Sequence, residues 1–145
     1  MWTSPATWQK ALPWSDILEV YGIGTDIIEV ARVAAAIEKN GSFLKKVYTD
    51  SEVKYCQGRD KGKYPSFAAR FAAKEAVAKS LSQGVGKNVS LNEIELANDE
   101  RGAPYITLHG NTLEYSRSLG IKEIKISVSA TDSFAVAYAM SLTAQ

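Results

Sequence analysis

The chain has 145 residues, of which 46% are hydrophobic and 23% are charged, and its formal net charge is +1. These values are typical of one globular domain, and they exclude a disordered chain, a collagen and a disulfide scaffold. Because the net charge is close to zero, composition predicts no nucleic-acid partner. No stretch reaches about 18 consecutive apolar residues, and the start lacks the basic and apolar runs of a signal peptide, so we expect no membrane span.

The chain has a single cysteine, Cys56. One thiol cannot form an internal disulfide and supplies too few ligands for a cysteine-type zinc site. No paired base lies near it in the sequence, so we interpret it as a packing or surface residue. A lone thiol fits a reducing compartment, and we expect a cytoplasmic protein.

Residues 1–19 contain all three tryptophans and two prolines, without regular spacing of apolar residues. We interpret them as an N-terminal extension, followed by one domain over residues 20–145. The domain is expected to begin with a strand from Val20 to Ile28. Gly22 and Gly24 lie inside this strand, where glycine indicates a close backbone approach or a bulge.

Helical spacing follows the first strand and ends at the stop signal Asn40-Gly41. The residues expected on its apolar face are Ile27, Val30, Ala31, Ala34 and Ile37. The next segment, Phe43 to Val47, is short, apolar and basic. Thr49 then has the position of an N-cap and Glu52 that of a capping-box partner, for a helix that runs to about Cys56.

A polar loop from Gly58 to Pro65 precedes the longest expected helix, Ser66 to about Leu81. Its many alanines favour helix formation and permit close packing of a neighbour. The glycines of the following turn, Gly84 and Gly86, could bring backbone amides to a phosphate, although a turn that ends the helix is the commoner explanation.

The remaining chain is mostly strand. The expected strands are Leu91–Leu96, Tyr105–Leu108, Ile124–Ala130 and Phe134–Leu142, with a loop at 98–104, a helix at 112–119 and a hairpin turn at 131–133. The order of a strand, then helices, then mostly strands predicts an α+β fold in which an antiparallel sheet packs against the long helix.

Asp26 stands where the first strand passes into a helix. A carboxylate there is costly to bury unless it caps the helix, pairs with a cation or holds a metal, and its position fits a helix N-cap as well. The preceding Gly-x-Gly matches a dinucleotide fingerprint only weakly. We reject that interpretation because the third glycine and a parallel βαβ unit are absent.

The long helix carries charges among alanine, phenylalanine and valine. Glu75 and Lys79 are four residues apart and share one helix face. One interpretation is a surface ion pair that stabilises the helix by a few tenths of a kcal/mol. However, charges on a largely buried helix need partners. A metal between Asp26 and Glu75, with Lys79 and Arg70 facing a phosphate, would satisfy all four.

Two segments match one family closely. They are GIGTDIIEVARV at 22–33 and FAARFAAKEAVAKSL at 67–81, and shorter segments at 49–52, 98–104 and 126–137 follow in order. Over about residues 20–142 the chain resembles the holo-acyl-carrier-protein synthases. The resemblance implies the 4′-phosphopantetheinyl transferase fold and the transfer of an arm from coenzyme A to a serine of acyl carrier protein, with Mg²⁺ as cofactor.

The resemblance also implies roles for individual residues. It implies metal binding by Asp26 and Glu75, and catalysis by these two residues with Lys79. The positions expected to bind coenzyme A are Arg70, Lys79, Gly84, Gly86, Pro104 and Thr131. Ala130 stands where the family usually has a histidine associated with coenzyme A binding. The sole histidine, His109, has no catalytic partner nearby in sequence, and we interpret it as structural or solvent-facing.

The family forms homotrimers with active sites between subunits, and its carrier protein is strongly acidic. The resemblance therefore predicts a homotrimer here as well. It predicts carrier docking at Arg32, together with Lys39, Lys45 and Lys46 in the same segment.

The sequence admits three other interpretations. A catalytically impaired carrier-binding relative would keep the fold, but a module without metal gains nothing from Asp26 and Glu75 as paired buried carboxylates. A transferase domain of a larger fatty acid synthase stays open. A nucleic-acid binder around Arg32 and Lys46 is disfavoured, because no basic stripe with interleaved aromatic residues accompanies them.

Overall fold

The structure is a computed structural model that describes residues 17–81 and 84–144. Most of the predicted extension, residues 1–16, lies outside the described residues, so the boundary of the domain stays a prediction. The first strand, β1 (Leu18–Glu29), begins at Leu18 rather than at Val20. It pairs antiparallel with the last strand, β5 (Phe134–Ala144).

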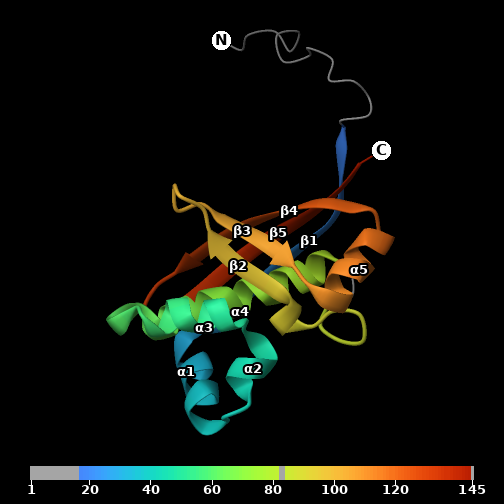
Figure 1. The fold of residues 1–145 in the computed structure, drawn as a ribbon. Coiled ribbons are helices and arrows are strands. Elements are labelled where there is room, and N and C mark those ends of the chain that lie inside the picture. Colours follow the sequence, from blue (N-terminus) through green and yellow to red (C-terminus); the bar gives the residue numbers. More distant parts are fainter. Residues whose placement is uncertain (1–16, 82–83, 145) are drawn as a thin grey trace, which may run out of the picture.

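The predicted α+β fold with an antiparallel sheet is confirmed. A three-stranded sheet has the order β1-β5-β4, in which β4 spans Ile121–Ala130. A separate hairpin pairs β2 (Ile94–Asn98) with β3 (Pro104–Leu108). Figure 1 shows the hairpin and the larger sheet on one long helix.

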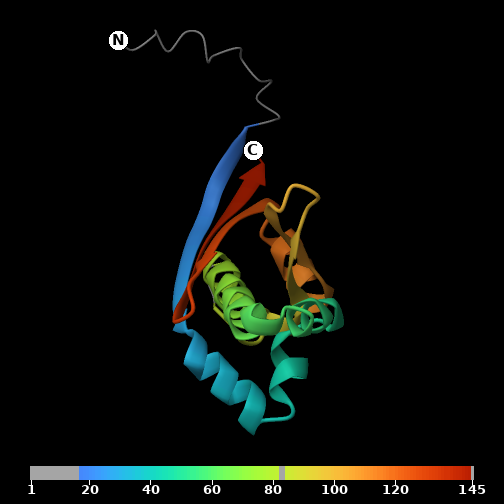
Figure 2. The same cartoon turned by 90° about the vertical axis from the view of Figure 1, so that its left-hand side faces the viewer.

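Five α-helices lie between these strands in sequence, counting the described residues alone. They are α1 (Val30–Lys39), α2 (Phe43–Val47), α3 (Asp50–Gln57), α4 (Lys63–Ser80) and α5 (Gly110–Ser118). Figure 2 looks nearly along α4, which lies between the three-stranded sheet on one side and the β2–β3 hairpin on the other. None of the described helices combines the length and apolar composition needed to cross a membrane.

The contact between β1 and α4 depends on two glycines. A Cβ atom at Gly24 would lie 1.9 Å from the carbonyl oxygen of Ala76, and one at Gly22 would lie 2.2 Å from that of Ser80. The pairing of β1 with β5 also shifts register between Val20 and Gly22. Both predicted uses of glycine, a close backbone approach and a bulge, are therefore present in this strand.

The predicted start of the long helix was wrong. The segment expected to be a loop up to Pro65 contains a 3₁₀ turn at Asp60–Gly62, and α4 begins directly after it, at Lys63. Pro65 lies in the first turn of α4, where an N–H group has no partner within the helix, so a proline is tolerated there.

The predicted apolar face of the first helix was partly wrong. Ile27 belongs to β1 and is 67% exposed, because the strand continues to Glu29 and its alternate residues point away from α4. Ala31 is also exposed. The buried residues of α1 are Val30 and Val33. By contrast, the capping box of Thr49 and Glu52 at the start of α3 is confirmed.

Three boundaries in the C-terminal half also differ from prediction. Leu91–Glu93 forms a 3₁₀ turn before β2, α5 begins at Gly110, and β4 begins at Ile121. Gly110 has a φ of +55°, and a Cβ there would lie 1.8 Å from the Glu93 carboxylate, which accepts from the N–H of Asn111. Glu93 therefore takes the place of a side-chain N-cap for α5, which a search for local capping residues could not detect.

Candidate active site

Asp26 and Lys79 meet where β1 lies against α4. Because Gly24 has no side chain, α4 comes so close that a Cβ there would be 2.9 Å from the Cβ of Lys79. The Lys79 Nζ donates to Asp26 Oδ1 at 3.3 Å and to the Thr25 carbonyl oxygen at 2.9 Å. The N-cap of α1 is Glu29, so the alternative that Asp26 caps this helix is wrong. Asp26 is instead paired with a cation.

Glu75 lies on α4 one turn before Lys79 and on the same side of the helix. It is half-buried, and burial raises the pKa of its carboxyl group. The nearby charge of Asp26 raises this pKa further, whereas Lys79 lowers it. Asp26 and Glu75 therefore carry like charges that disfavour each other, and a bound cation would relieve that repulsion.

The donor set suits Mg²⁺. Asp26 and Glu75 supply only carboxylate oxygens, which a hard cation prefers. In the described part of the chain, no group of three or more His, Cys, Asp and Glu residues could form an all-protein metal site. Mg²⁺ often binds one or two carboxylates and completes its coordination with water and substrate phosphate, so the residues present fit a metal shared with a phosphate ligand.

Arg70 lies on a different side of α4 and does not join Asp26, Glu75 and Lys79. It is nine residues before Lys79, about half a turn around the helix axis. Its guanidinium stacks on the Tyr55 ring at 4.2 Å and donates to Ser66 Oγ at 3.1 Å.

The Arg70 side chain is nevertheless incompletely satisfied. The residue is 6% exposed, and its Nε has no hydrogen-bond partner. It borders a cavity of about 220 Å³ that is also lined by Ser51, Glu52, Tyr55, Leu96, Ala97 and Asn98. A buried donor without a partner costs free energy, so this cavity favours a ligand that accepts hydrogen bonds.

The glycine turn after α4 uses its amides within the chain. Gly84, with a φ of +65°, donates to the Ala78 carbonyl oxygen at 3.2 Å, and Gly86 donates to that of Val89 at 2.9 Å. These bonds favour a turn that ends the helix. Coenzyme A contacts at the two glycines stay a prediction.

The other predicted coenzyme A positions lie at strand ends. Pro104 begins β3 opposite Asn98. The Thr131 hydroxyl accepts from the N–H groups of Ser133 and Phe134 in the turn between β4 and β5. Ala130 ends β4 beside this turn, so the turn forms without the usual histidine.

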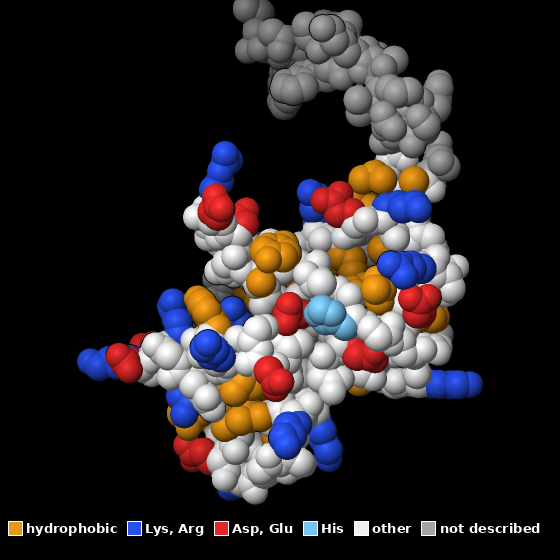
Figure 3. Space-filling model, in the orientation of Figure 1, with side chains coloured by type: hydrophobic (Ala, Val, Ile, Leu, Met, Phe, Trp, Pro, Cys, Tyr) orange, Lys and Arg blue, Asp and Glu red, His pale blue; other side chains and the backbone are white. Residues whose placement is uncertain are grey.

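The predicted carrier-docking residues are all exposed. Arg32 and Lys39 lie on α1, and Lys45 and Lys46 lie on α2. Figure 3 shows basic side chains on the surface of the lower part of the molecule, where these helices lie. They place positive charges beyond the end of the strand that carries Asp26, among acidic residues such as the exposed Glu38.

The only cysteine and the only histidine of the chain lie where a packing residue and a solvent-facing residue are expected. Cys56 is fully buried, and burial raises the pKa of its thiol, which leaves it unreactive. His109 is half exposed, and its Nε2 lies 3.7 Å from Glu95 Oε1.

Sequence reasoning missed Lys74, which is fully buried and pairs with Glu52. The available signal was a lysine within an alanine-rich helix, where a charge needs a partner. The partner could not be located, because Glu52 is distant in sequence and was assigned only to the capping box.

Comparison with known proteins identifies the family. The model of the "4'-phosphopantetheinyl transferase superfamily" matches residues 22–139. A holo-[acyl-carrier-protein] synthase of Ruminiclostridium cellulolyticum is 50% identical over 119 residues, which cover 81% of this chain and 89% of that protein. One from Halothermothrix orenii is 42% identical over 120 residues, covering 82% and 94%.

Solved structures show the same similarity. A holo-ACP synthase crystal structure from Plasmodium yoelii has a TM-score of 0.79 and 32% identity, and the match covers 90% of this chain and 100% of that one. A Bacillus anthracis holo-(acyl-carrier-protein) synthase in complex with CoA has a TM-score of 0.72 and 32% identity, covering 86% and 98%. The chain therefore belongs to the 4′-phosphopantetheinyl transferase superfamily.

Proposed function

We propose that this chain is a holo-[acyl-carrier-protein] synthase. It transfers the 4′-phosphopantetheine arm of coenzyme A to a serine of acyl carrier protein and releases adenosine 3′,5′-bisphosphate. The observation that carries the proposal is the contact of Asp26 with Lys79, which lies one helical turn after Glu75, across the close approach of α4 to Gly24. Relatives with this name match over most of their own length.

In this reaction the serine oxygen forms a bond to the β-phosphorus of coenzyme A, and the bond from that phosphorus to the departing bisphosphate breaks. The serine loses its proton, and negative charge grows on the departing phosphate. Catalysis of such a step depends mainly on positioning and on stabilisation of that charge.

The site residues divide this work. Asp26 and Glu75 would hold Mg²⁺, which when bound supplies neutralisation of the pyrophosphate charge. Lys79, whose side chain is 49% exposed and pairs with Asp26, would donate to phosphate oxygens and offset the charge on the departing group. Neither alternative weighed from the sequence, an impaired relative or a domain of a larger synthase, gains a specific observation.

The carrier protein is proposed to dock on α1 and α2. Arg32, Lys39, Lys45 and Lys46 offer an exposed positive surface to an acidic partner. Such complementarity raises the rate of encounter and selects the partner. We further propose that the enzyme is cytoplasmic and serves fatty acid biosynthesis.

We also propose a homotrimer with active sites between subunits. The face of the three-stranded sheet opposite α4 exposes large apolar side chains, namely Ile23, Ile27, Phe134, Tyr138 and Met140. A cavity of about 360 Å³ lies on this face, lined by Ile23, Ile126, Tyr138 and Met140 among others. Soluble proteins seldom leave such a patch uncovered.

Mass spectrometry of apo-acyl carrier protein tests the proposed reaction. After incubation with the chain, coenzyme A and Mg²⁺, we expect a mass gain of one phosphopantetheine. Folded Asp26→Ala and Glu75→Ala variants should lose the activity, whereas Glu114→Ala, which alters an exposed ion pair on α5, should retain it. No mass gain with the unaltered chain would reject the function, and normal rates in both site variants would reject the metal assignment.

A further inference from the structure

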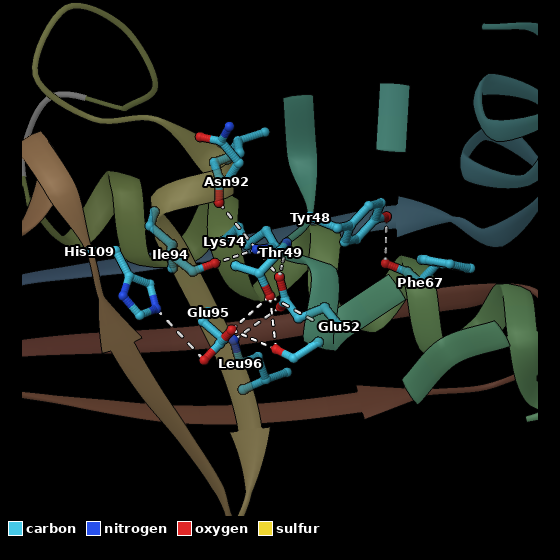
Figure 4. Close-up of polar contacts among 12 residues, drawn as sticks. Tyr48, Thr49, Glu52, Phe67, Lys74, Asn92, Ile94, Glu95, Leu96 and His109 are labelled. Carbon is cyan, nitrogen blue, oxygen red and sulfur yellow. Dashed lines mark hydrogen bonds and ion pairs between the residues drawn. The ribbon is translucent and has the colours of Figure 1, made fainter. Parts of the chain in front are cut away.

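The side of α4 that faces α3 and the β2–β3 hairpin holds a buried ion pair. Lys74 is fully buried, and its Nζ donates to Glu52 Oε1 at 2.5 Å. The same nitrogen donates to the carbonyl oxygens of Leu91, at 3.1 Å, and of Ile94 (Figure 4). An ammonium group has three N–H donors, so each donor of Lys74 has an acceptor.

Glu52 is bonded as completely as its partner. Its Oε1 also accepts from the N–H of Thr49, and its Oε2 accepts from that of Leu96, both at 3.0 Å. The residue is only 2% exposed. The pair therefore joins α4 to the start of α3, to β2 and to the turn before β2. Because hydrogen bonds are directional, these bonds restrict the orientation of α4 relative to those elements.

The opposite side of α4 has a different kind of contact. Against β1, the backbone of the helix at Ala76 and Ser80 lies directly on Gly22 and Gly24. Small residues allow this close approach, but they offer no large side chain that fits between neighbours and resists rotation about the helix axis. On this side the orientation of α4 depends on a few bonds near its C-terminal end, from Lys79 to β1 and from Ser141 to the Ser80 carbonyl oxygen. The bonds of Lys74 add a constraint on another side of the helix.

Lys74 immediately precedes Glu75. Successive residues of an α-helix point about 100° apart, so Lys74 faces α3 while Glu75 faces β1. Side-chain ends lie about 5–6 Å from a helix axis, so a rotation of roughly 10° moves a carboxylate by about 1 Å. A misplacement of about 1 Å can lower the rate at a site on the order of 100-fold.

We propose that Glu52 and Lys74 are a positioning pair that sets the rotation of α4 and thereby keeps the Glu75 carboxylate opposite Asp26. Both residues are buried on a side of α4 that does not face Asp26, so they act on the proposed metal site only through the helix. The inference rests on the proposed function, in which Asp26 and Glu75 share a divalent cation. The inference predicts that loss of the Glu52–Lys74 pair weakens cation binding at Asp26 and Glu75.

The test uses the double variant Glu52→Gln with Lys74→Met. Removing both buried charges at similar volume leaves neither charge unpaired, so this variant is better tolerated than a single substitution. Glu52→Asp serves as a second, milder variant, which keeps the ion pair but draws the carboxylate back. Thr112→Val is the matched control, because Thr112 is a fully buried hydroxyl that bonds Ser90 and Glu93 and makes no hydrogen bond to α4.

Mn²⁺, a paramagnetic probe for the cation site, is titrated into each full-length protein with coenzyme A present and the carrier omitted, and the broadening of the backbone amide signals of Asp26 and Glu75 is measured by NMR. We expect the Mn²⁺ concentration for half-maximal broadening to rise about tenfold in the double variant and less in Glu52→Asp, in keeping with a carboxylate displaced by about 1 Å. Thr112→Val should lower the melting temperature but leave Mn²⁺ binding unchanged.

Three results would overturn the inference. If the double variant folds and binds Mn²⁺ as the unaltered chain does, the pair has no positioning role. If the double variant does not fold, unchanged Mn²⁺ binding by Glu52→Asp likewise excludes a positioning role. If the unaltered chain shows no broadening at Asp26, the proposed metal site itself is wrong. This failure is distinguishable, because it appears before any substitution in the pair.

In parallel, kcat of the variants should fall without a rise in KM for the carrier.

Discussion

Replacing Gly24 by alanine is expected to push α4 away from β1 and to separate the two halves of the proposed site. A Cβ at Gly24 would lie 1.9 Å from the Ala76 carbonyl oxygen, whereas real Cβ atoms essentially never come closer than 3.0 Å to a neighbour. The backbone must therefore move by about 1.1 Å or more, the difference between these two distances. Overpacking of this kind costs about 1–3 kcal/mol of stability. Displacement of Lys79 and Glu75 from Asp26 by about 1 Å lowers the rate on the order of 100-fold.

The assay compares Gly24→Ala with Gly41→Ala in the rate of carrier modification, read by mass spectrometry, and in thermal unfolding. Gly41 is the matched control, because a Cβ there meets no atom within 4 Å. We expect a large loss of rate and a lower melting temperature only for Gly24→Ala. If the two variants behaved alike, close packing of β1 on α4 would not position the site.

Three further predictions concern other parts of the structure. Burial alone would raise the pKa of Glu95, but hydrogen bonds from Thr49 and Ser51 and the proximity of His109 outweigh it and lower that pKa. A carboxyl group whose pKa is lowered by folding stabilises the protein above its ordinary pKa, and this stabilisation is lost as the pH falls. Glu95→Gln should therefore have a lower melting temperature than the unaltered chain at pH 7, and the difference should vanish in acid. A difference that does not depend on pH would contradict this. Lys74→Met alone leaves the buried Glu52 charge unpaired and should lower the free energy of unfolding, measured in urea, by about 3–5 kcal/mol, whereas a loss under 1 kcal/mol would show that the charge is not buried in solution. Ile27→Asp places a charge on the exposed apolar sheet face and should yield monomers in sedimentation velocity, and an unchanged sedimentation coefficient would argue against self-association through this face.

The approach of the segments that carry Asp26 and Glu75 could be predicted because its constraints are local, whereas their joint role as metal ligands stays a prediction. Asp26 follows a strand with two glycines, and Glu75 lies on a helix rich in alanine, so each segment indicates a close contact before the fold is known. The glycines explain how that contact forms, since both receive the backbone of α4.

Arg70 shows where motif-based reasoning went further than helix geometry allows. The need of buried charges for partners suggests a phosphate shared by Arg70 and Lys79, yet nine residues of α-helix turn a side chain to the opposite side. The helical period alone therefore separates these two residues within one chain. Only contact with another copy could bring an Arg70 to the site, and such a contact leaves no periodic signal in the sequence.

The buried pair of Lys74 with Glu52 could not be predicted for a different reason. Apart from the predicted capping bond, its bonds connect residues far apart in sequence, and three of the partner atoms belong to the backbone of Leu91, Ile94 and Leu96. Backbone groups have the same chemistry at every position, so no residue type marks them. The start of α4 was missed for a related reason, because proline signals a loop almost everywhere except in the first turn of a helix.

The most direct test of the proposed site is thermal unfolding of the chain with coenzyme A, measured with and without Mg²⁺. A ligand that binds only the folded state raises the melting temperature in proportion to its binding free energy. We predict that coenzyme A stabilises the chain strongly only when Mg²⁺ is present, and that Asp26→Ala or Glu75→Ala abolishes this increment. Equal stabilisation with and without Mg²⁺, or an increment that survives both substitutions, would contradict a cation shared by these two carboxylates.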